Sequence, residues 1–230
     1  MEILYENKDI IVCIKPIGVL SEESDGAESL PKMLSAYLEK KGEAGQIFTV
    51  HRLDAGVGGV MVYAKNKNAA AELSRQIQER TFEKEYLAVV EGIPTEASGS
   101  MTDLLFRDSA KNKSYVVKRM RKGVKEAKLD YELLASVEEN NAGGEACERS
   151  LVKILLHTGR THQIRVQFSS RNMPLCGDKR YGSRNAAKDS AIALFSYRLT
   201  FKMPNEKEKV TFSHKPSDSY PWNLFDIGQI

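Results

Sequence analysis

The sequence predicts an α+β protein with a mixed, mostly antiparallel sheet that is flanked by helices and loops. Short apolar runs bounded by Gly, Pro, Asn or Asp recur along the chain, which is typical of strands. Only three or four segments repeat their apolar residues at helical spacing, and they do not alternate regularly with the strands, which disfavours a parallel βαβ sheet. With 230 residues, 41% of them hydrophobic, residues 1–230 are expected to form a single domain with a proper core.

The first part of the chain contains two predicted strands and one predicted helix. Residues 3–5 and 10–14 are expected to form strands on either side of a polar turn. The segment 15–18, Lys-Pro-Ile-Gly, then interrupts the pattern. Ser29 is expected to cap a helix that runs to about Lys41, because apolar residues recur at three- and four-residue spacing between them.

The next part predicts a buried strand, a second helix and a core strand. The apolar run 60–64 indicates a short buried strand. Asn66 or Asn68 is expected to cap a helix that ends near Arg80. Residues 84–90 are expected to form a strand that Gly and Pro close.

In the second half, polar and basic turns separate the apolar runs, which predicts antiparallel pairing. Thr161 is expected to cap a short helix that ends before Pro174. Residues 140–149 are rich in Gly, Asn and Glu and are expected to form an exposed loop, and residues 221–230 a short helix. Strands are expected over 101–106, 114–117, 127–135, 151–156, 192–201 and 209–212.

One loop concentrates reactive side chains. His51-Arg52-Leu53-Asp54 places a carboxylate beside an imidazole and a guanidinium, and three glycines follow within residues 56–59. Glycines let the backbone turn sharply or approach a ligand closely, and an Asp at the mouth of a rigid strand is where reactive groups are often placed. A structural Asp that closes a turn is the competing interpretation, and for a single Asp it is the more common one.

A second polar loop gathers four potential cations within nine residues: His157, Arg160, His162 and Arg165. They surround the start of the predicted short helix, and both a helix N-terminus and clustered Arg side chains favour anions. A helix cap with ordinary surface charges is the alternative. The density of cations favours a functional role.

The distribution of charge is more informative than its sum. Thirty-four basic residues against 31 acidic ones give a net charge of only +3. Between residues 111 and 128, however, one acidic residue stands among eight basic ones, which suits a polyanion; a solvated basic hairpin fits equally well. The eight are Lys111, Lys113, Lys118, Arg119, Arg121, Lys122, Lys125 and Lys128.

Several classes of function lack sequence support. The three cysteines are scattered and form no CxxC, which predicts reduced thiols in a cytoplasmic protein. The four histidines show no metal-ligand spacing, and there is no Walker loop or GxGxxG, so the sequence supports neither a metal site nor a bound nucleotide cofactor. We find no signal peptide or transmembrane run, and nothing demands an oligomer. A monomer without a membrane partner is therefore expected.

These residue types allow a specific chemistry. Asp54 is a candidate nucleophile toward an anomeric or otherwise electrophilic carbon, and Arg165 or Arg52 is available to favour its ionised form. Tyr86, on a core strand, is able to present a flat ring to a base, and Arg52 to fill the space that an extruded base leaves. No second catalytic carboxylate stands out, which disfavours a two-carboxylate glycosidase.

The order of these motifs resembles the RluA family of RNA pseudouridine synthases. HRLD alone is a weak match, whereas the long TGRTHQIRV motif, correctly ordered behind it, is specific. The matching segments are 15–18 for the family's KPxG, 51–54 for HRLD, 84–86 for KxY, 158–166 for TGRTHQIRV and 177–182 for GDxxYG.

The resemblance implies the pseudouridine synthase catalytic fold and the isomerisation of a uridine in rRNA or tRNA, without a metal or organic cofactor. By this resemblance Asp54 is the catalytic carboxylate, which either attacks the anomeric carbon of the sugar or takes a proton from the sugar. It implies four roles around Asp54: Tyr86 packs against the target base, Arg165 pairs with Asp54, and Arg52 enters the RNA stack, while His51, Arg160 and His162 contribute to substrate binding.

The sequence departs from the family pattern at three places. Val57-Gly58-Gly59 replaces the usual Thr-Ser-Gly, Gln167 replaces a frequent His, and Phe195-Ser196 replaces a frequent His-Ala. The chain begins directly with the catalytic region, so no N-terminal RNA-binding domain is expected, and RNA contacts are expected from the catalytic domain, including residues 111–128.

Two other functions stay open at this point. One is an RNA-binding or RNA-remodelling protein on the same fold with weak or no catalysis, which the loss of two hydroxyls at positions 57 and 58 favours. The other is a glycoside or nucleoside hydrolase that uses Asp54, and it would release free uracil or sugar.

Overall fold

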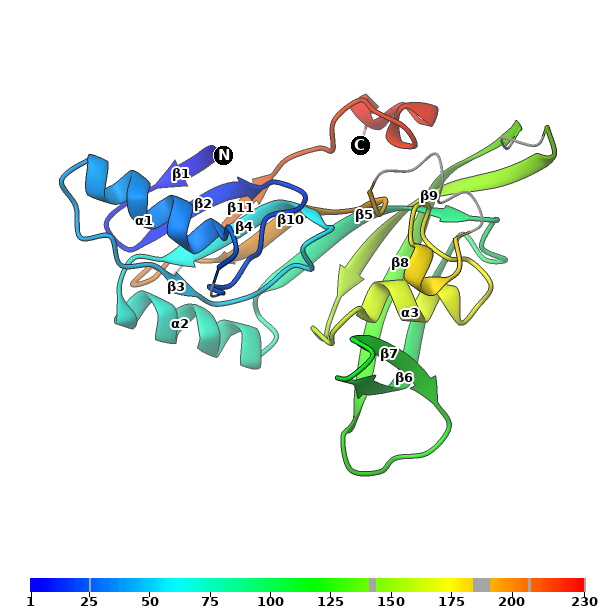
Figure 1. Ribbon diagram of the computed structural model, residues 1–230, viewed down its shortest axis with the longest axis horizontal. Helices are drawn as coiled ribbons and strands as arrows, with labels where there is room; N and C mark the ends of the chain where they lie inside the picture. The colour runs from blue at the N-terminus through cyan, green and yellow to red at the C-terminus, as the bar shows by residue number, and fades with distance from the viewer. Residues whose placement is uncertain (25, 141–143, 184–190, 207, 230) are drawn as a thin grey trace. The chain divides into compact units, whose positions relative to one another are not determined.

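The computed structural model describes residues 1–24, 26–140, 144–183, 191–206 and 208–229. Two compact units make up the chain (Figure 1). Unit 1 comprises Met1–Lys84 and Ser196–Lys215, and unit 2 comprises Glu85–Phe195 and Pro216–Ile230.

Unit 1 combines several strands with two helices, α1 (Leu30–Lys40) and α2 (Lys67–Gln78). The strand order is β1-β2-β4-β10, with β3 beside β4 and β11 beside β10. The pairs β1–β2, β2–β4, β3–β4 and β10–β11 are all antiparallel. The bounds are β1 Glu2–Glu6, β2 Ile10–Lys15, β3 Phe48–Thr49, β4 Gly58–Ala64, β10 Leu194–Lys202 and β11 Lys209–Ser213.

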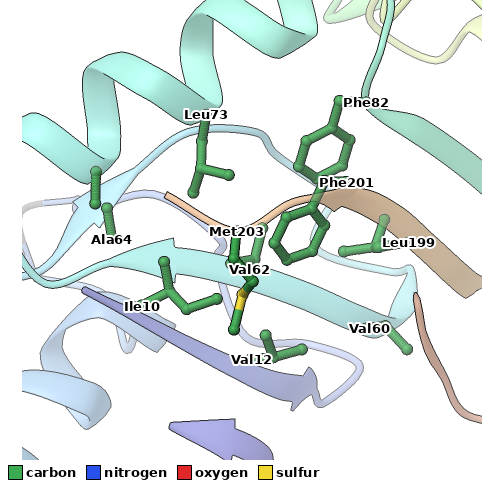
Figure 2. Packing of buried hydrophobic residues seen from close by; sticks show 11 residues of the cluster. Ile10, Val12, Val60, Val62, Ala64, Leu73, Phe82, Leu199, Phe201 and Met203 are labelled. Atoms are coloured by element: carbon green, nitrogen blue, oxygen red, sulfur yellow. The ribbon is translucent and has the colours of Figure 1, made fainter. Parts of the chain in front are cut away.

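The core of unit 1 lies between its sheet and α2. Leu73 of α2 points toward the apolar side chains of β2, β4 and β10 (Figure 2). Phe82 and Phe201 stack with ring centroids 5.0 Å apart and planes 4° from parallel, a favourable aromatic contact. Every residue of β4 is buried, so the strand that follows the HRLD loop is fixed by packing.

Both predicted helix caps of unit 1 are confirmed in position, but only one of them makes a capping hydrogen bond through its side chain. Asn66 caps α2, because its side chain accepts a hydrogen bond from the Ala69 N–H at 2.9 Å. Ser29 occupies the cap position of α1 without a side-chain cap hydrogen bond. Pro31 lies in the first turn, where its ring fixes φ near the helical value. The N–H that proline lacks would have no partner within the helix at this position.

Unit 2 is a second antiparallel arrangement with strand order β5-β9-β8-β6-β7. All four pairs are antiparallel, which confirms the predicted pairing. The strands are β5 Glu83–Glu91, β6 Ser98–Asp108, β7 Lys113–Val117, β8 Val124–Asn140 and β9 Ala146–Leu156. Helix α3 and the 3₁₀ segments are α3 Gln163–Ser169, η1 Lys179–Tyr181, η2 Trp222–Leu224 and η3 Ile227–Gln229.

The exposed loop predicted over residues 140–149 is wrong at Asn140 and at residues 146–149, which belong to strands. Strand β8 continues to Asn140, which pairs with Ala146 at the start of β9; residues 141–143 lie outside the described chain. Cross-strand hydrogen bonds satisfy this polar backbone, and Arg149 forms an ion pair with Glu139 at 3.1 Å. The loop composition misled because strands exposed to solvent tolerate polar residues.

The prediction that Thr161 caps α3 is also wrong. The cap residue is His162, in the left-handed region with φ 54°, and it makes no side-chain cap hydrogen bond. The Gln163 side chain closes this turn instead, because its Oε1 accepts from the Thr158 hydroxyl at 2.7 Å and from the Arg160 N–H at 3.1 Å.

Gly59 offers a test of how tightly β4 packs. Its φ is +122°, and an added Cβ would lie 2.6 Å from the Ser196 nitrogen, so Gly59→Ala is strained and also displaces backbone. We expect a loss of about 2–5 kcal/mol in the free energy of unfolding, measured with urea. Gly18→Ala is the matched control, because its φ is +90° with nothing within 4 Å of the added Cβ; we expect about 1–2 kcal/mol. Equal losses would contradict the packing role of Gly59.

Candidate active site

The backbone before Asp54 is held by a buried serine. The Ser21 hydroxyl accepts from the Leu53 N–H at 3.1 Å and donates to the Leu53 carbonyl at 2.8 Å. The Tyr63 hydroxyl of β4 donates to the Ser21 carbonyl at 2.9 Å, and the Val57 N–H donates to the Asp54 carbonyl at 3.0 Å. Asp54 therefore stands in a closed turn between two fixed points, Leu53 and β4.

A buried ammonium lies under the same turn. Lys15, 1% exposed, donates to the carbonyls of Val19 at 2.6 Å, Pro16 at 2.9 Å and Ala55 at 3.2 Å. Burial lowers the pKa of Lys15 to about 8, and the Asp54 carboxylate opposes that shift. Lys15 thus ties the KPxG segment to the HRLD loop and supplies a positive charge near Asp54.

His51 joins the loop to β4. Its Nε2 accepts from the Val62 N–H at 3.2 Å, so the neutral ring carries its hydrogen on Nδ1. Burial of the imidazole, and next the charge of Lys84, lower the pKa of His51 to about 3. The ring is therefore neutral at physiological pH and positions the loop, while its role in substrate binding stays a prediction.

Arg52 differs from its neighbours because its side chain is 47% exposed. Its Nη1 lies 3.0 Å from Glu22 Oε2, which is 54% exposed. An ion pair between two exposed side chains is weak and is readily exchanged for another anion. Arg52 therefore lies on the surface of unit 1, and its entry into an RNA stack stays a prediction.

In unit 2, Tyr86 belongs to β5 and pairs with Ile154 of β9. Only 5% of the residue is exposed, so packing fixes the orientation of its ring. Tyr86 is therefore a rigid aromatic group, as the predicted contact with a base requires.

Arg165 of α3 is held by a carboxylate that the sequence prediction missed. Its Nε and Nη2 donate to the two oxygens of Asp178 at 2.6 and 2.9 Å, and Asp178 is 1% exposed. The guanidinium also lies 5.1 Å from the centre of the Tyr181 ring. This two-point contact fixes the plane of Arg165. Pairing of Arg165 with Asp54 stays a prediction.

His162 and Arg160 support the same helix in different ways. His162 is 9% exposed, and its Nδ1 lies 3.1 Å from the Tyr181 hydroxyl, so it packs inside unit 2. Arg160 is partly exposed, and its Nε donates to the Glu126 carbonyl at 2.9 Å. Of these two residues, Arg160 is the more exposed.

The residues that depart from the family pattern have packing roles. Val57 is 2% exposed, and the buried Ser196 hydroxyl donates to the Val60 carbonyl at 2.9 Å. Gln167 Nε2 donates to the Met101 carbonyl at 3.2 Å and to Asp103 at 2.8 Å, which ties α3 to β6. These replacements therefore preserve the local structure.

The eight basic residues between Lys111 and Lys128, here named the basic edge, extend along β7 and the start of β8. Six of them are exposed and two are partly exposed. The aromatic Tyr115, with the apolar Val116 and Met120, is exposed among them. Exposed rings beside cations suit stacking with bases and contact with phosphates.

Other kinds of site find little support. No group of three or more His, Cys, Asp or Glu side chains in the described residues is arranged to hold a metal ion. None of the helices in the described part of the chain is long and apolar enough to cross a membrane.

The comparison with known protein families decides the class. The family model described as RNA pseudouridylate synthase matches residues 9–170, more than half of the chain. This chain belongs to the RNA pseudouridylate synthase family. The members are isomerases that act on RNA, and the predicted family and α+β fold class are confirmed.

Three proteins illustrate the similarity. A protein of Aquifex aeolicus, described as an uncharacterised RNA pseudouridine synthase, is 34% identical over 96% of this chain and 71% of its own length. Ribosomal large subunit pseudouridine synthase D of Borreliella burgdorferi is 32% identical over 93% and 65%. The solved structure of human RNA pseudouridylate synthase domain containing 1 matches with a TM-score of 0.71 and 25% identity, covering 94% of this chain and 83% of that one. The chain spans only 58–71% of the length of the first curated relatives it matches.

The buried His51 ring predicts a loss of stability in acid. Below about pH 6.5 the unfolded chain takes up a proton on this ring, whereas the folded chain does so only near pH 3, so stability falls as the pH falls between these values. Unfolding in urea near pH 7 and near pH 5 measures this effect against His51→Gln, which keeps an acceptor for Val62. The stability advantage of the wild type is expected to shrink by about 1–2 kcal/mol at the lower pH. An unchanged difference would show that the ring is not buried as a neutral group.

Proposed function

We propose that this protein isomerises a specific uridine in rRNA or tRNA to pseudouridine, with Asp54 as the catalytic carboxylate. The single observation that carries the proposal is the construction around Asp54. Ser21 and Lys15 fix the backbone on either side of it, and the Lys15 ammonium is a buried positive charge that interacts with Asp54.

The proposed reaction balances without a co-substrate. The bond from N1 of uracil to C1′ breaks, a bond from C5 to C1′ forms, and the hydrogen lost from C5 is balanced by one gained at N1. Asp54 either attacks C1′, forming a covalent intermediate, or takes a proton from the sugar. In both routes the detached uracil has to be held while it turns, which exclusion of water favours.

The remaining candidates take the roles that the family resemblance implies. Tyr86 packs against the base, Arg52 enters the stack left by the extruded nucleotide, and Arg165 pairs with Asp54. The exposure of Arg52 and the rigid setting of Tyr86 support the first two roles. His51 and His162 contribute to substrate binding by fixing the conformation of their loops, and Arg160 contributes its positive charge.

We propose that the basic edge binds the RNA backbone. Its exposed cations and the exposed Tyr115 support binding that depends on salt more than on sequence. The name of the Borreliella relative, a ribosomal large subunit enzyme, supports rRNA as the first substrate to test. The free cysteines among the described residues support a cytoplasmic location, and we propose a monomer.

A second candidate function is RNA binding or remodelling with little catalysis. The replacement of two hydroxyl residues by Val57 and Gly58 favours it. The Val57 N–H nevertheless donates to the Asp54 carbonyl at 3.0 Å and closes the turn. This hydrogen bond comes from the backbone, so it does not depend on the side chain at position 57. The isomerase therefore stays the better supported function.

Pseudouridine mapping of total RNA tests the choice. We expect a uridine in rRNA or tRNA to lose its modification in cells that lack the gene and to regain it with the wild-type protein. Asp54→Asn keeps the size of the side chain but removes its charge, so we expect a loss of activity of at least about 1,000-fold with RNA binding retained. Full rescue by Asp54→Asn would contradict the role of Asp54, and release of free uracil would indicate the hydrolase.

A further inference from the structure

Arg52 is paired with an acidic side chain of its own unit. Its Nη1 donates to Glu22 Oε2 at 3.0 Å, and both side chains are about half exposed. Glu22 belongs to the segment between β2 and α1, 30 positions before Arg52, so the fold brings the two charges together and local sequence does not. A carboxylate therefore already contacts the guanidinium that the proposed function assigns to RNA.

The position of Glu22 is fixed by its neighbour Ser21. Ser21 is 4% exposed, and its hydroxyl exchanges two hydrogen bonds with the backbone of Leu53. The Tyr63 hydroxyl donates to the Ser21 carbonyl at 2.9 Å. Residues 21 and 22 are thereby held beside residues 53 and 52. An exposed ion pair is weak by itself, but this buried connection keeps Glu22 within reach of Arg52.

A second acidic residue follows directly and lacks such a contact. Glu23 is exposed, and its side chain makes no ion pair or hydrogen bond among the residues that the structure describes. Both glutamates would repel the phosphates of an RNA bound at the HRLD loop. Only Glu22 also holds the side chain that is proposed to enter the RNA, so the two positions separate general repulsion from a specific contact.

Given the proposed function, in which Arg52 enters the RNA stack, we infer that the Arg52–Glu22 ion pair is an autoinhibitory contact that RNA has to displace. A guanidinium inserted between bases leaves no room for a carboxylate at Nη1, and the surrounding phosphates repel that carboxylate. Part of the free energy of RNA binding is therefore used to break the pair. Glu22 recaptures Arg52 as the RNA leaves.

Glu22 thus acts on binding and release and leaves the chemical step unchanged. The ion pair exists only while Arg52 lies outside the RNA, so it stabilises the free protein relative to the complex and raises the Kd. In the complex the pair is broken, and the rate from that state does not depend on Glu22. Because the pair is exposed, its effect amounts to a few-fold change in Kd, and salt weakens it.

RNA binding by Glu22→Gln tests the contact. The probe is a labelled transcript of the RNA that mapping identifies, or labelled total tRNA if mapping identifies none. Glu22→Gln keeps the size of the side chain without its charge. We expect it to lower the Kd about two- to fivefold at low salt and to slow dissociation of the RNA. The single-turnover rate at saturating protein should stay within about twofold of the wild type.

Glu23→Gln is the matched control, because it removes the same charge one position away without releasing an ion pair. Its effect on the Kd should be smaller than that of Glu22→Gln, and the difference should shrink at high salt. In an Arg52→Gln background the two glutamine variants should behave alike, since a double-mutant cycle isolates the interaction between two side chains. Both glutamates are exposed, so the Tm should stay within about 2 °C of the wild type.

Three results would overturn the autoinhibitory contact. Equal Kd values for Glu22→Gln and Glu23→Gln would leave general repulsion alone. Tighter binding that persists with Arg52→Gln would show that Glu22 does not act through Arg52. Weaker binding by Glu22→Gln would show that Glu22 supports the RNA-bound conformation.

The fate of the proposed isomerase is measured separately. A wild type that forms no pseudouridine, but binds RNA more tightly after Glu22→Gln, would overturn the isomerase and retain the contact. A wild type that binds neither transcript nor tRNA would overturn both.

Discussion

The hydrogen bonds of the Lys15 ammonium are the constraint on which the candidate active site depends. Three carbonyls converge on one buried cation, and two of them belong to the segment after β2 while the third belongs to the residue after Asp54. Carbonyl oxygens that converge on one point repel one another, so a hydrogen-bond donor has to lie between them. Lys15 is that donor, and its charge acts on Asp54 as well. One side chain thus sets both the backbone and the electrostatics of the loop.

Most of the fold could be predicted because most of it depends on local pattern. Apolar runs gave the strands their approximate places, and Asn66 identified the start of α2 because its capping hydrogen bond joins residues only three positions apart. The failures depend on distant contacts. The polar segment before Arg149 is a strand because β8 pairs with it, and α3 begins at Gln163 because that side chain binds Thr158 and Lys128. No short window of sequence contains those partners.

The site could be predicted in its residue types but not in its connections. Motif order singled out Asp54, Tyr86 and Arg165, whereas nothing in spacing alone pairs Arg165 with Asp178, 13 positions away. Lys15 lay inside a matched motif, yet its significance comes from its burial and its three carbonyl partners, which sequence does not measure.

Tritium release is the measurement that tests the central claim most directly, because pseudouridine formation removes the hydrogen from C5 of uracil. RNA labelled with tritium at C5 of uridine, prepared from cells that lack the gene, would be incubated with the purified protein. The account predicts release that reaches one tritium per target uridine with the wild type and none with Asp54→Asn. Full-length rRNA and tRNA that release no tritium to the wild-type protein would contradict it.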